Sequence, residues 1–253
     1  MTTLIQRSRS ALVRGVLGED RYRRLTREYT RRKQRPRIGR VDFGDLRVTE
    51  PLCGWYGRDR GGPIDRYYIE NFLDEHRAQV SGRVLEIGER TYTERFGAGV
   101  TQADMLHVDD VDGATYVADL ADAPSIPSDA YDCVIITQTL QMIYDVRAAV
   151  ATLHRILKPG GVLLCTVPGV TQLADPRWNR TWYWSFTPLA AERLIGDEFG
   201  AGAVTVGMHG NVLAVTSFLQ GLTPDDLTTD ELDVADPSYP MIVTVEAVKN
   251  AQA

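Results

Sequence analysis

Short apolar runs alternate with polar, helix-compatible stretches from Ser81 to the end of the chain. Apolar runs of about four to eight residues are typical of buried strands, and strands that alternate with helices form a mostly parallel sheet. The run at 131–137 is apolar almost throughout, which indicates a strand in the centre of the sheet. We therefore expect an α/β fold with a doubly wound sheet. The predicted strands are 83–87, 100–108, 115–118, 131–137, 162–169, 203–208 and 241–248.

Two segments between these strands carry apolar residues on one helical face, 145–157 and 188–199. We predict a helix in each. The first should end at the sequence KPGG, residues 158–161, because proline and paired glycines favour a turn over a continued helix.

The charged residues are distributed unevenly along the chain. Residues 1–40 contain 13 Lys and Arg and 3 acidic residues, whereas the rest of the chain contains 15 and 31. We therefore predict two parts, a basic, Arg-rich arm over 1–45 and a domain over 46–253. Residues 10–37 mix apolar side chains with arginines at near-helical spacing, which indicates an amphipathic basic helix.

Two interpretations of this arm stay open. In the first, it is a solvated helix that packs on the acidic domain or neutralises it. In the second, it contacts an anionic surface, such as membrane phosphate or a polyanionic partner. We do not expect a nucleic-acid partner, since no aromatic-interleaved basic groove or recognised nucleic-acid motif follows the arm. The sequence leaves the oligomeric state open, with a homo-oligomer as one option.

Cys53, Cys133 and Cys165 lie far apart and form no CxxC or Cys/His cluster. This spacing suggests neither a disulfide framework nor a zinc site, and we expect no metal. No apolar run approaches the roughly 18 residues of a membrane span, and the N-terminus has arginines where a signal peptide needs an apolar block. We therefore expect a cytoplasmic protein.

Five motifs occur in a recognisable order. They are VLEIG (84–88), VADL (117–120), YDCVIITQTLQMI (131–143), LHRILKPGGVLLCTVPG (153–169) and FT (186–187). With these motifs the chain resembles class I S-adenosylmethionine-dependent methyltransferases of the methyltransferase domain 11 type, over about residues 64–249. The resemblance implies an enzyme with a Rossmann-like, mostly parallel seven-stranded sheet whose last strand is antiparallel. It also implies S-adenosyl-L-methionine as cofactor and a small-molecule acceptor.

The implied reaction transfers a methyl group to an oxygen or nitrogen of a small polar or glycosylated acceptor. Similar bacterial sequences suggest natural-product or surface-polysaccharide biosynthesis. Two alternatives stay open. The chain is either a methyltransferase-fold enzyme of another class that has lost methyl transfer, or a non-catalytic partner of a glycosyltransferase complex.

Ligands of a doubly wound sheet bind beyond the carboxyl ends of the strands, so residues that follow the first four strands should line one crevice. By the resemblance, Glu86 and Gly88 hold the methionine part of the cofactor, and glycine lets the backbone approach the ligand. In the family, an acidic residue at the end of the second strand accepts hydrogen bonds from the ribose hydroxyls. Asp109 is the first candidate here and Asp104 is the second.

Asp119 and Leu120 match the family's position beside the adenine. The alternative for Asp119 is a turn or cap residue. Leu140 and Gln141 stand where the family often has a Glu-His pair, so we expect no base in this loop. The residues that would face the sulfonium follow the central strand: Thr137, Gln138 and Thr139.

Residues 89–92, ERTY, stand where the family has further glycines. The usual backbone cradle for the aminocarboxypropyl tail of the cofactor is therefore lost. Arginine suits a carboxylate, because its planar fork donates two parallel hydrogen bonds. Arg58, Arg60 and Arg66 precede the fold, and we expect Arg58 or Arg66 to hold the tail. The alternative is that Arg58 and Arg60 are exposed loop charges.

Methyl transfer is a direct displacement that depends on placing a nucleophile about 3 Å from the methyl carbon. His209 follows the sixth strand, and its near-neutral titration makes it the candidate general base. The segment 177–186 is rich in aromatic residues that could cover an acceptor. The alternative is a hydrophobic cluster that anchors an exposed hairpin. The candidates for acceptor contacts are Tyr56, Trp178, Trp182 and Trp184.

Overall fold

The computed structural model describes residues 18–176 and 178–250 of the chain. Residues 1–17, which hold the beginning of the predicted basic helix, lie outside the described residues, and so does the side chain of Trp178. The chain divides into two compact units, Met1–Thr49 and Glu50–Ala253.

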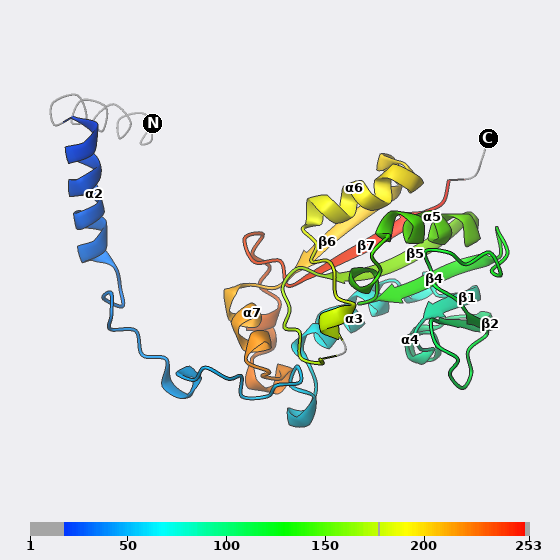
Figure 1. The fold of residues 1–253 in the computed structure, drawn as a ribbon, viewed down its shortest axis with the longest axis horizontal. Coiled ribbons are helices and arrows are strands. Elements are labelled where there is room, and N and C mark those ends of the chain that lie inside the picture. The colour runs from blue at the N-terminus through cyan, green and yellow to red at the C-terminus, as the bar shows by residue number, and fades with distance from the viewer. Residues whose placement is uncertain (1–17, 177, 251–253) are drawn as a thin grey trace. The chain divides into compact units, whose positions relative to one another are not determined.

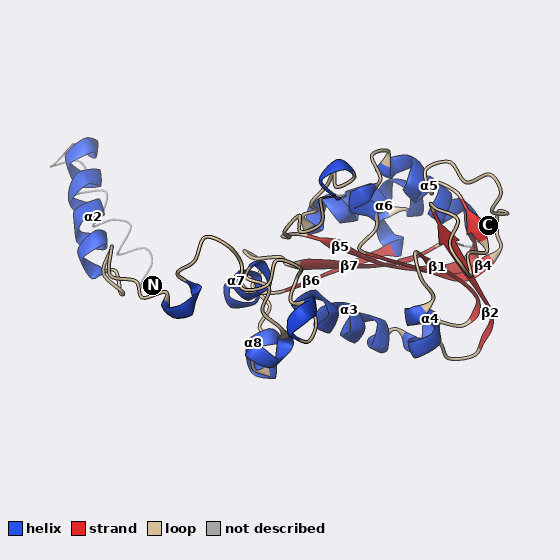
Figure 2. Cartoon of the chain, turned by 60° about the horizontal axis from the view of Figure 1, so that its bottom comes forward, coloured by secondary structure: helices blue, strands red, loops and turns tan. Residues whose placement is uncertain are grey.

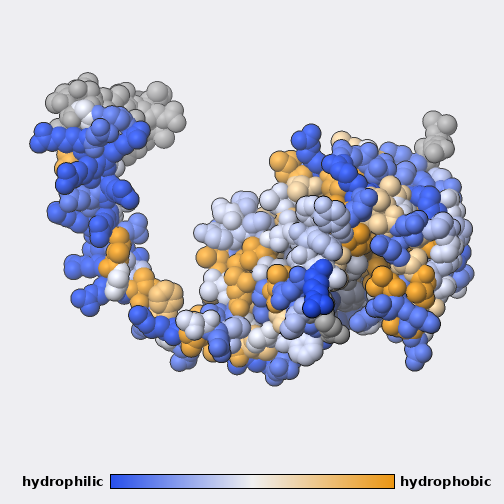
Figure 3. All heavy atoms as spheres, viewed as in Figure 1, coloured by the Kyte–Doolittle hydropathy of each residue, from blue (hydrophilic) through white to orange (hydrophobic). Residues whose placement is uncertain are grey.

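The described part of the first unit contains α2 (Glu19–Lys33) and the 3₁₀ helix η1 (Gly44–Leu46). Acidic residues lie in the first turn of α2 and basic residues in its last turn, as the helix dipole favours. None of its residues is buried, and hydrophilic side chains cover it (Figure 3). The prediction of a basic helix is confirmed over these residues, but α2 is polar on nearly all sides and buries none of its residues.

The second unit is built on a seven-stranded sheet with the order β3-β2-β1-β4-β5-β7-β6 (Figure 1). Strands β1 to β5 pair in parallel, and β7 is antiparallel to both β5 and β6. The predicted fold class is therefore confirmed. The strands are β1 (Gly82–Ile87), β2 (Val100–His107), β3 (Tyr116–Val117), β4 (Tyr131–Thr137), β5 (Leu157–Pro168), β6 (Val204–His209) and β7 (Ile242–Val248).

Helices cover both faces of the sheet (Figure 2). On one face lie α5 (Val146–Ile156) and α6 (Pro188–Phe199), and on the other lie α3 (Ile64–Glu75), α4 (Thr91–Phe96) and α7 (Val212–Leu219). The remaining helices of this unit are α8 (Thr229–Leu232), η2 (Arg58–Arg60), η3 (Arg77–Gln79), η4 (Leu140–Met142), η5 (Trp178–Arg180), η6 (Ala201–Ala203) and η7 (Pro224–Asp226).

The central strand β4 contributes side chains to the hydrophobic cores on both faces of the sheet, because successive side chains of a strand point to opposite faces. Val134 and Ile136 pack with α5 and α6, whereas Cys133 and Ile135 pack with α3 and α4. All four are fully buried, which explains why the run 131–137 is apolar almost throughout.

Helix α5 ends at Ile156, directly before the KPGG segment, so the predicted end of this helix is confirmed. The turn predicted at KPGG is not found. Residues 158–161 lie inside β5 and not in a turn before it. The pairing of β4 with β5 shifts register there, since Tyr131 pairs with Leu157 and Cys133 with Val162. Proline and glycine are tolerated at such an irregularity, and here Gly160 and Gly161 still bond to Lys249 on the other side of β5, with N···O distances of 2.7 and 2.9 Å.

Three further observations concern the sequence-based expectations. Cys53, Cys133 and Cys165 are buried and free. Among the described residues, no group of three or more His, Cys, Asp or Glu is arranged to hold a metal ion. The described helices include none with the length and apolar composition that a membrane crossing requires.

Candidate cofactor site

A cavity of about 840 Å³ lies at the carboxyl ends of the first four strands. Gly88 follows β1, Asp109 follows β2, Asp119 follows β3 and Thr139 follows β4, and all four line it. Parallel strands of a doubly wound sheet bring these ends together even though the residues are distant in sequence. The volume lies within the range of about 300–1,000 Å³ that ligand sites occupy.

The exposed carboxylates of Asp109 and Asp119 and the buried side chain of Leu120 line this cavity. The N–H of Asp109 donates to Nδ1 of His107 at 2.9 Å, so the strand end orients the backbone of this aspartate. Asp119 accepts the N–H of Ala121 through Oδ1 at 2.9 Å, which is the turn role considered as its alternative. The same aspartate also lines the cavity beside Leu120, which is 4% exposed. The two roles are compatible because a carboxylate has two oxygens.

The loop after β4 contributes through one of its three predicted residues. Thr139 lines the cavity and donates its hydroxyl to the carbonyl of Thr137 at 2.9 Å. Gln138 has a positive φ of 47°, an uncommon conformation for a residue other than glycine. Its N–H donates to the carbonyl of Thr166 on β5 at 2.9 Å. Thr137 and Gln138 support the loop and are not among the residues that line the cavity.

Glu86 is placed differently from its expected position beside the methionine part. Its buried carboxylate accepts the N–H groups of Tyr92 and Thr93 at 3.1 and 2.7 Å, and so binds the first turn of α4. Burial raises the pKa of this carboxyl, and the hydrogen bonds from α4 oppose the rise. Because side chains alternate along a strand, Glu86 faces α4 and not the cavity.

Asp104, the second candidate for the ribose, is also placed elsewhere. It lies within β2, and its side chain is 5% exposed. Arg83 forms an ion pair with Oδ2 at 2.7 Å, and the hydroxyl of Tyr131 donates to the same oxygen at 3.0 Å. Burial would raise the pKa of Asp104, but the hydrogen bonds from Arg83, Gln102 and Tyr131 outweigh it and lower the pKa. The structure therefore makes Asp104 part of a buried polar cluster between strands.

In the segment 89–92, which stands where the family has further glycines, the side chain of Tyr92 packs into the protein. Tyr92 is 7% exposed, and its hydroxyl accepts a hydrogen bond from Nη1 of Arg66. Arg66 lies in the first turn of α3 next to Asp65, whose Oδ1 is buried without a hydrogen-bond partner. Arg58 is exposed and stacks over the ring of Trp55 at 5.6 Å from its centroid. Of the two predicted arginines, only Arg66 contacts the segment after β1.

His209 does not line the cavity. It ends β6, the strand at the edge of the sheet opposite β3. Its ring stacks on Tyr68 at 5.6 Å, and its Nε2 lies 3.3 Å from the hydroxyl of Thr244. Burial lowers the pKa of the imidazole. The candidate general base thus lies away from the cavity, because the strand order places β6 at the far edge of the sheet.

The predicted acceptor residues fall in different surroundings. Tyr56 is 8% exposed and donates its hydroxyl to the carbonyl of Gln172 at 2.7 Å, so it belongs to the core and not to an acceptor wall. Trp184 is exposed, and the half-buried Trp182 donates its Nε1–H to the carbonyl of Trp184 at 3.0 Å. Neither tryptophan lines the cavity.

Two aromatic residues of this cavity, Tyr144 and Tyr183, are not among the predicted acceptor contacts. Tyr144 follows the YDCVIITQTLQMI motif directly, and Tyr183 lies inside the aromatic segment 177–186. The density of aromatic residues pointed to the right segment. It did not indicate which ring would face the cavity, because an irregular segment has no fixed side-chain period.

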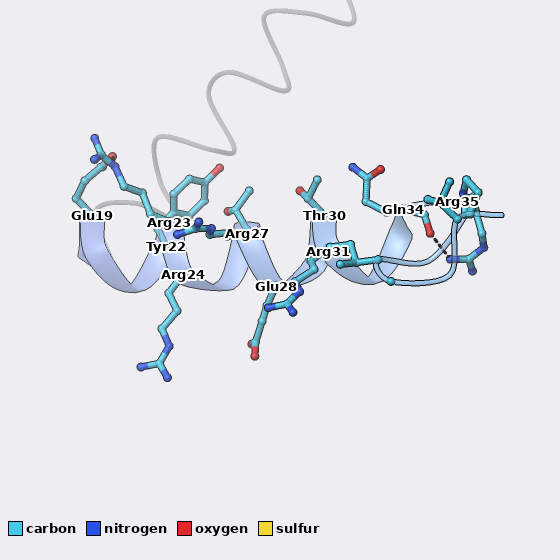
Figure 4. A pocket seen from close by; sticks show the side chains of 15 residues that line it. Glu19, Tyr22, Arg23, Arg24, Arg27, Glu28, Thr30, Arg31, Gln34 and Arg35 are labelled. Carbon is cyan, nitrogen blue, oxygen red and sulfur yellow. Dashed lines mark hydrogen bonds and ion pairs between the residues drawn. The ribbon is translucent and has the colours of Figure 1, made fainter. Parts of the chain in front are cut away.

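A second hollow, of about 1340 Å³, runs along α2 in the first unit. Its lining side chains project from the helix and the turn after it (Figure 4). Half of the labelled residues are arginines, and the labelled side chains do not converge on a common point. The described lining residues of this hollow therefore form no set of converging polar groups of the kind that orients a small ligand.

The chain was compared with known proteins. Residues 64–190 match a family described as "Methyltransferase domain". The ubiquinone/menaquinone biosynthesis C-methyltransferase UbiE of Pectobacterium carotovorum subsp. carotovorum (strain PC1) is 39% identical over 54 residues. These residues are 21% of this chain and 22% of that protein, so the match spans about a fifth of the curated relative.

The chain is also similar to solved structures. An S-adenosylmethionine-dependent methyltransferase from Archaeoglobus fulgidus is 14% identical, with a TM-score of 0.50 over 77% of this chain and 98% of that chain. One from Mesorhizobium loti is 16% identical, with a TM-score of 0.48 over 74% of this chain and 98% of that chain.

Proposed function

The chain belongs to the methyltransferase domain family, and we propose that it transfers a methyl group from S-adenosyl-L-methionine to an oxygen or nitrogen of a small polar or glycosylated acceptor. One observation carries the proposal. Gly88, Asp109 and Asp119, which follow three different strands, line a single cavity at the carboxyl edge of the sheet. We propose natural-product or surface-polysaccharide biosynthesis in the cytoplasm as the setting, on the resemblance of the motifs.

The lining of the cavity fits the adenosine part of the cofactor. The carboxylate of Asp109 would accept hydrogen bonds from the ribose hydroxyls. Asp119 would accept the exocyclic amine of the adenine, and Leu120 would cover the ring. Gly88 leaves the backbone accessible, since the space where a Cβ would lie has no atom within 4 Å. When bound, the cofactor supplies an electrophilic methyl group.

The tail of the cofactor needs a partner other than a glycine cradle. We propose Arg66 for its carboxylate, because this guanidinium lies next to the segment after β1 and contacts Tyr92. Glu86 would not contact the cofactor and would act indirectly, because it holds the first turn of α4. Thr139 would face the sulfonium, supported by the backbone of Thr137 and Gln138.

The chain's contribution to the reaction is then mainly one of placement. A displacement of this kind gains most of its rate from the alignment of nucleophile and methyl carbon and from the exclusion of water. We assign no general base, since Leu140 and Gln141 stand where the family often has a Glu-His pair and His209 lies at another edge of the sheet. An acceptor whose proton is readily lost to water requires no base.

Calorimetry with S-adenosylhomocysteine tests the proposal. We expect Asp109→Ala and Asp119→Ala each to weaken binding by about 1–3 kcal/mol, because a bound donor loses its acceptor. This corresponds to about 5-fold to 150-fold in Kd. Asp110→Ala is the matched control, since Asp110 is an exposed neighbour that does not line the cavity.

Two outcomes would count against the site. Unchanged affinity in both aspartate variants would refute the assignment of the cavity. Absence of binding to the unmodified protein at millimolar S-adenosylhomocysteine would favour the alternative that the fold has lost methyl transfer.

We propose in addition that the basic arm contacts an anionic surface. Each Arg or Lys near an anionic membrane contributes about 1 kcal/mol at moderate salt. We expect deletion of residues 1–40 to abolish sedimentation with phosphatidylserine vesicles and to leave the affinity for S-adenosylhomocysteine unchanged. Neutral phosphatidylcholine vesicles serve as the control. Equal sedimentation of the full chain and the deletion variant would leave the arm as a solvated helix.

A further inference from the structure

Tyr144 and Tyr183 line the cavity, and Trp184 packs against Tyr144 just outside the lining. These three rings are here called the aromatic platform. Tyr144 packs edge-on against Tyr183 at 5.2 Å between ring centroids and stacks on Trp184 at 6.1 Å. Tyr144 is 71% exposed, Tyr183 48% and Trp184 38%. Large apolar side chains grouped at a cavity and left open to water mark a surface that contacts a ligand or partner.

The platform is held in place by the backbone. The N–H groups of Tyr183 and Trp184 donate to the carbonyl of Gln141 at 2.8 and 3.2 Å. These bonds attach the segment after β5 to the loop after β4. The rings are therefore set relative to the cavity before any ligand binds, which lowers the entropy cost of stacking on them.

The polar groups of Trp184 and Tyr183 already form hydrogen bonds within the protein. The Nε1–H of Trp184 donates to the carbonyl of Ile143 at 3.0 Å, and the hydroxyl of Tyr183 donates to the carbonyl of Arg180 at 3.4 Å. What these two residues still offer a ligand is the face of the ring. A planar ring binds such faces well, because stacked aromatic pairs add about 0.5–1.5 kcal/mol to the burial of apolar area.

Two apolar side chains, Met142 and Ile143, line the cavity beside Tyr144. Oδ1 of Asp145 accepts the N–H of Ala148 at the start of α5, which leaves the second oxygen of this carboxylate for a single hydroxyl of an acceptor. A sugar would bury several hydroxyls here, and each buried hydroxyl without a partner is costly. A flat aromatic ring with one hydroxyl suits this part of the cavity better than a sugar does, because it buries fewer hydroxyls.

We infer that the aromatic platform binds the ring of a phenol-type acceptor, with Tyr144 as its main contact. This inference rests on the proposed function and narrows its acceptor class. The phenol oxygen would form a bond to the methyl carbon while the carbon–sulfur bond breaks and its electron pair stays on sulfur. The phenol proton would pass to water, and the products would be an aryl methyl ether and S-adenosylhomocysteine.

The test titrates 1-naphthol, a planar phenol, into the full chain in the presence of saturating S-adenosylhomocysteine, and methyl α-glucopyranoside in a parallel series. We expect 1-naphthol to bind and the glucoside not to bind. Tyr144→Ala should raise the Kd of 1-naphthol about tenfold, whereas Tyr144→Phe should retain the affinity of the unmodified protein. Tyr239→Ala is the control, because this tyrosine is 40% exposed and lies outside the cavity lining.

The outcomes separate the platform from the cofactor site. Unchanged 1-naphthol affinity in Tyr144→Ala, or binding of the glucoside alone, would overturn the inference. A fall in S-adenosylhomocysteine affinity in Tyr144→Ala would also overturn it, since the ring would then cover the adenine. If the unmodified protein does not bind S-adenosylhomocysteine, the proposed function fails. The affinity of the same variants for 1-naphthol, measured without S-adenosylhomocysteine, then still tests the platform.

Discussion

Asp104→Ala is expected to lower the free energy of unfolding by about 3 kcal/mol, because removal of one partner leaves the other charge of a largely buried pair uncompensated. Arg83 would lose its ion pair at 2.7 Å, and Tyr131, which is fully buried, would lose the acceptor of its hydroxyl. Urea denaturation followed by tryptophan fluorescence measures the change. Asp109→Ala is the matched control, since the same residue type is exposed there and we expect less than about 0.5 kcal/mol.

The pH dependence provides an independent check on Asp104. The pKa of this carboxyl is lowered in the folded protein, so the stability that it contributes is present above the ordinary aspartate range and is lost as pH falls through the folded pKa. The difference between the unmodified protein and Asp104→Ala should therefore narrow below about pH 4. A difference that stays constant from pH 7 to pH 3 would contradict the charged pair.

A comparison of Asp104→Ala with Asp109→Ala separates an effect on stability from an effect on cofactor binding. Asp104→Ala should retain its affinity for S-adenosylhomocysteine at temperatures where it is folded, whereas Asp109→Ala should lose affinity and retain stability. The opposite pattern would restore Asp104 as the ribose ligand.

Gly221→Ala is expected to destabilise the second unit by about 3 kcal/mol. Gly221 has a φ of +69°, which costs a residue with a Cβ about 1–2 kcal/mol. An added Cβ would also lie 2.1 Å from the carbonyl oxygen of Cys53, and overpacking of this kind costs about 1–3 kcal/mol. The contact matters because the N–H of Cys53 donates to the carbonyl of Gln220 at 3.2 Å, which holds the chain ahead of α3 against the end of α7.

Two other glycines separate the causes of this effect. Gly99 has a φ of +84° with no atom within 4 Å of an added Cβ, so Gly99→Ala should show the conformational cost alone. Gly202 has open space at this position and no positive φ, so Gly202→Ala should change stability by less than about 0.5 kcal/mol. Thermal unfolding of the three variants measures both costs. Equal stability of Gly221→Ala and Gly99→Ala would show that the backbone at Cys53 yields without cost.

The sheet and the place of the cavity could be predicted from the sequence because both follow from local patterns. Apolar runs separated by helical stretches predict strands, and the motifs at their ends predict which loops meet. Gly88, Asp109 and Asp119 line the cavity for this reason. The arm was also visible in the sequence, since its charge differs sharply from that of the domain.

The sequence alone determined the order of strands and helices along the chain and the edge of the sheet where the cavity lies, because residue periodicity and turn chemistry act within a few positions of the chain. Only the tertiary structure decided what each side chain meets there. Glu86 and Asp104 are acidic residues on neighbouring strands, yet one binds the start of α4 and the other pairs with Arg83. Tyr144 and Tyr183 meet because the carbonyl of Gln141 holds their segments together. Such partners are distant in sequence, and only close packing of the whole domain selects them.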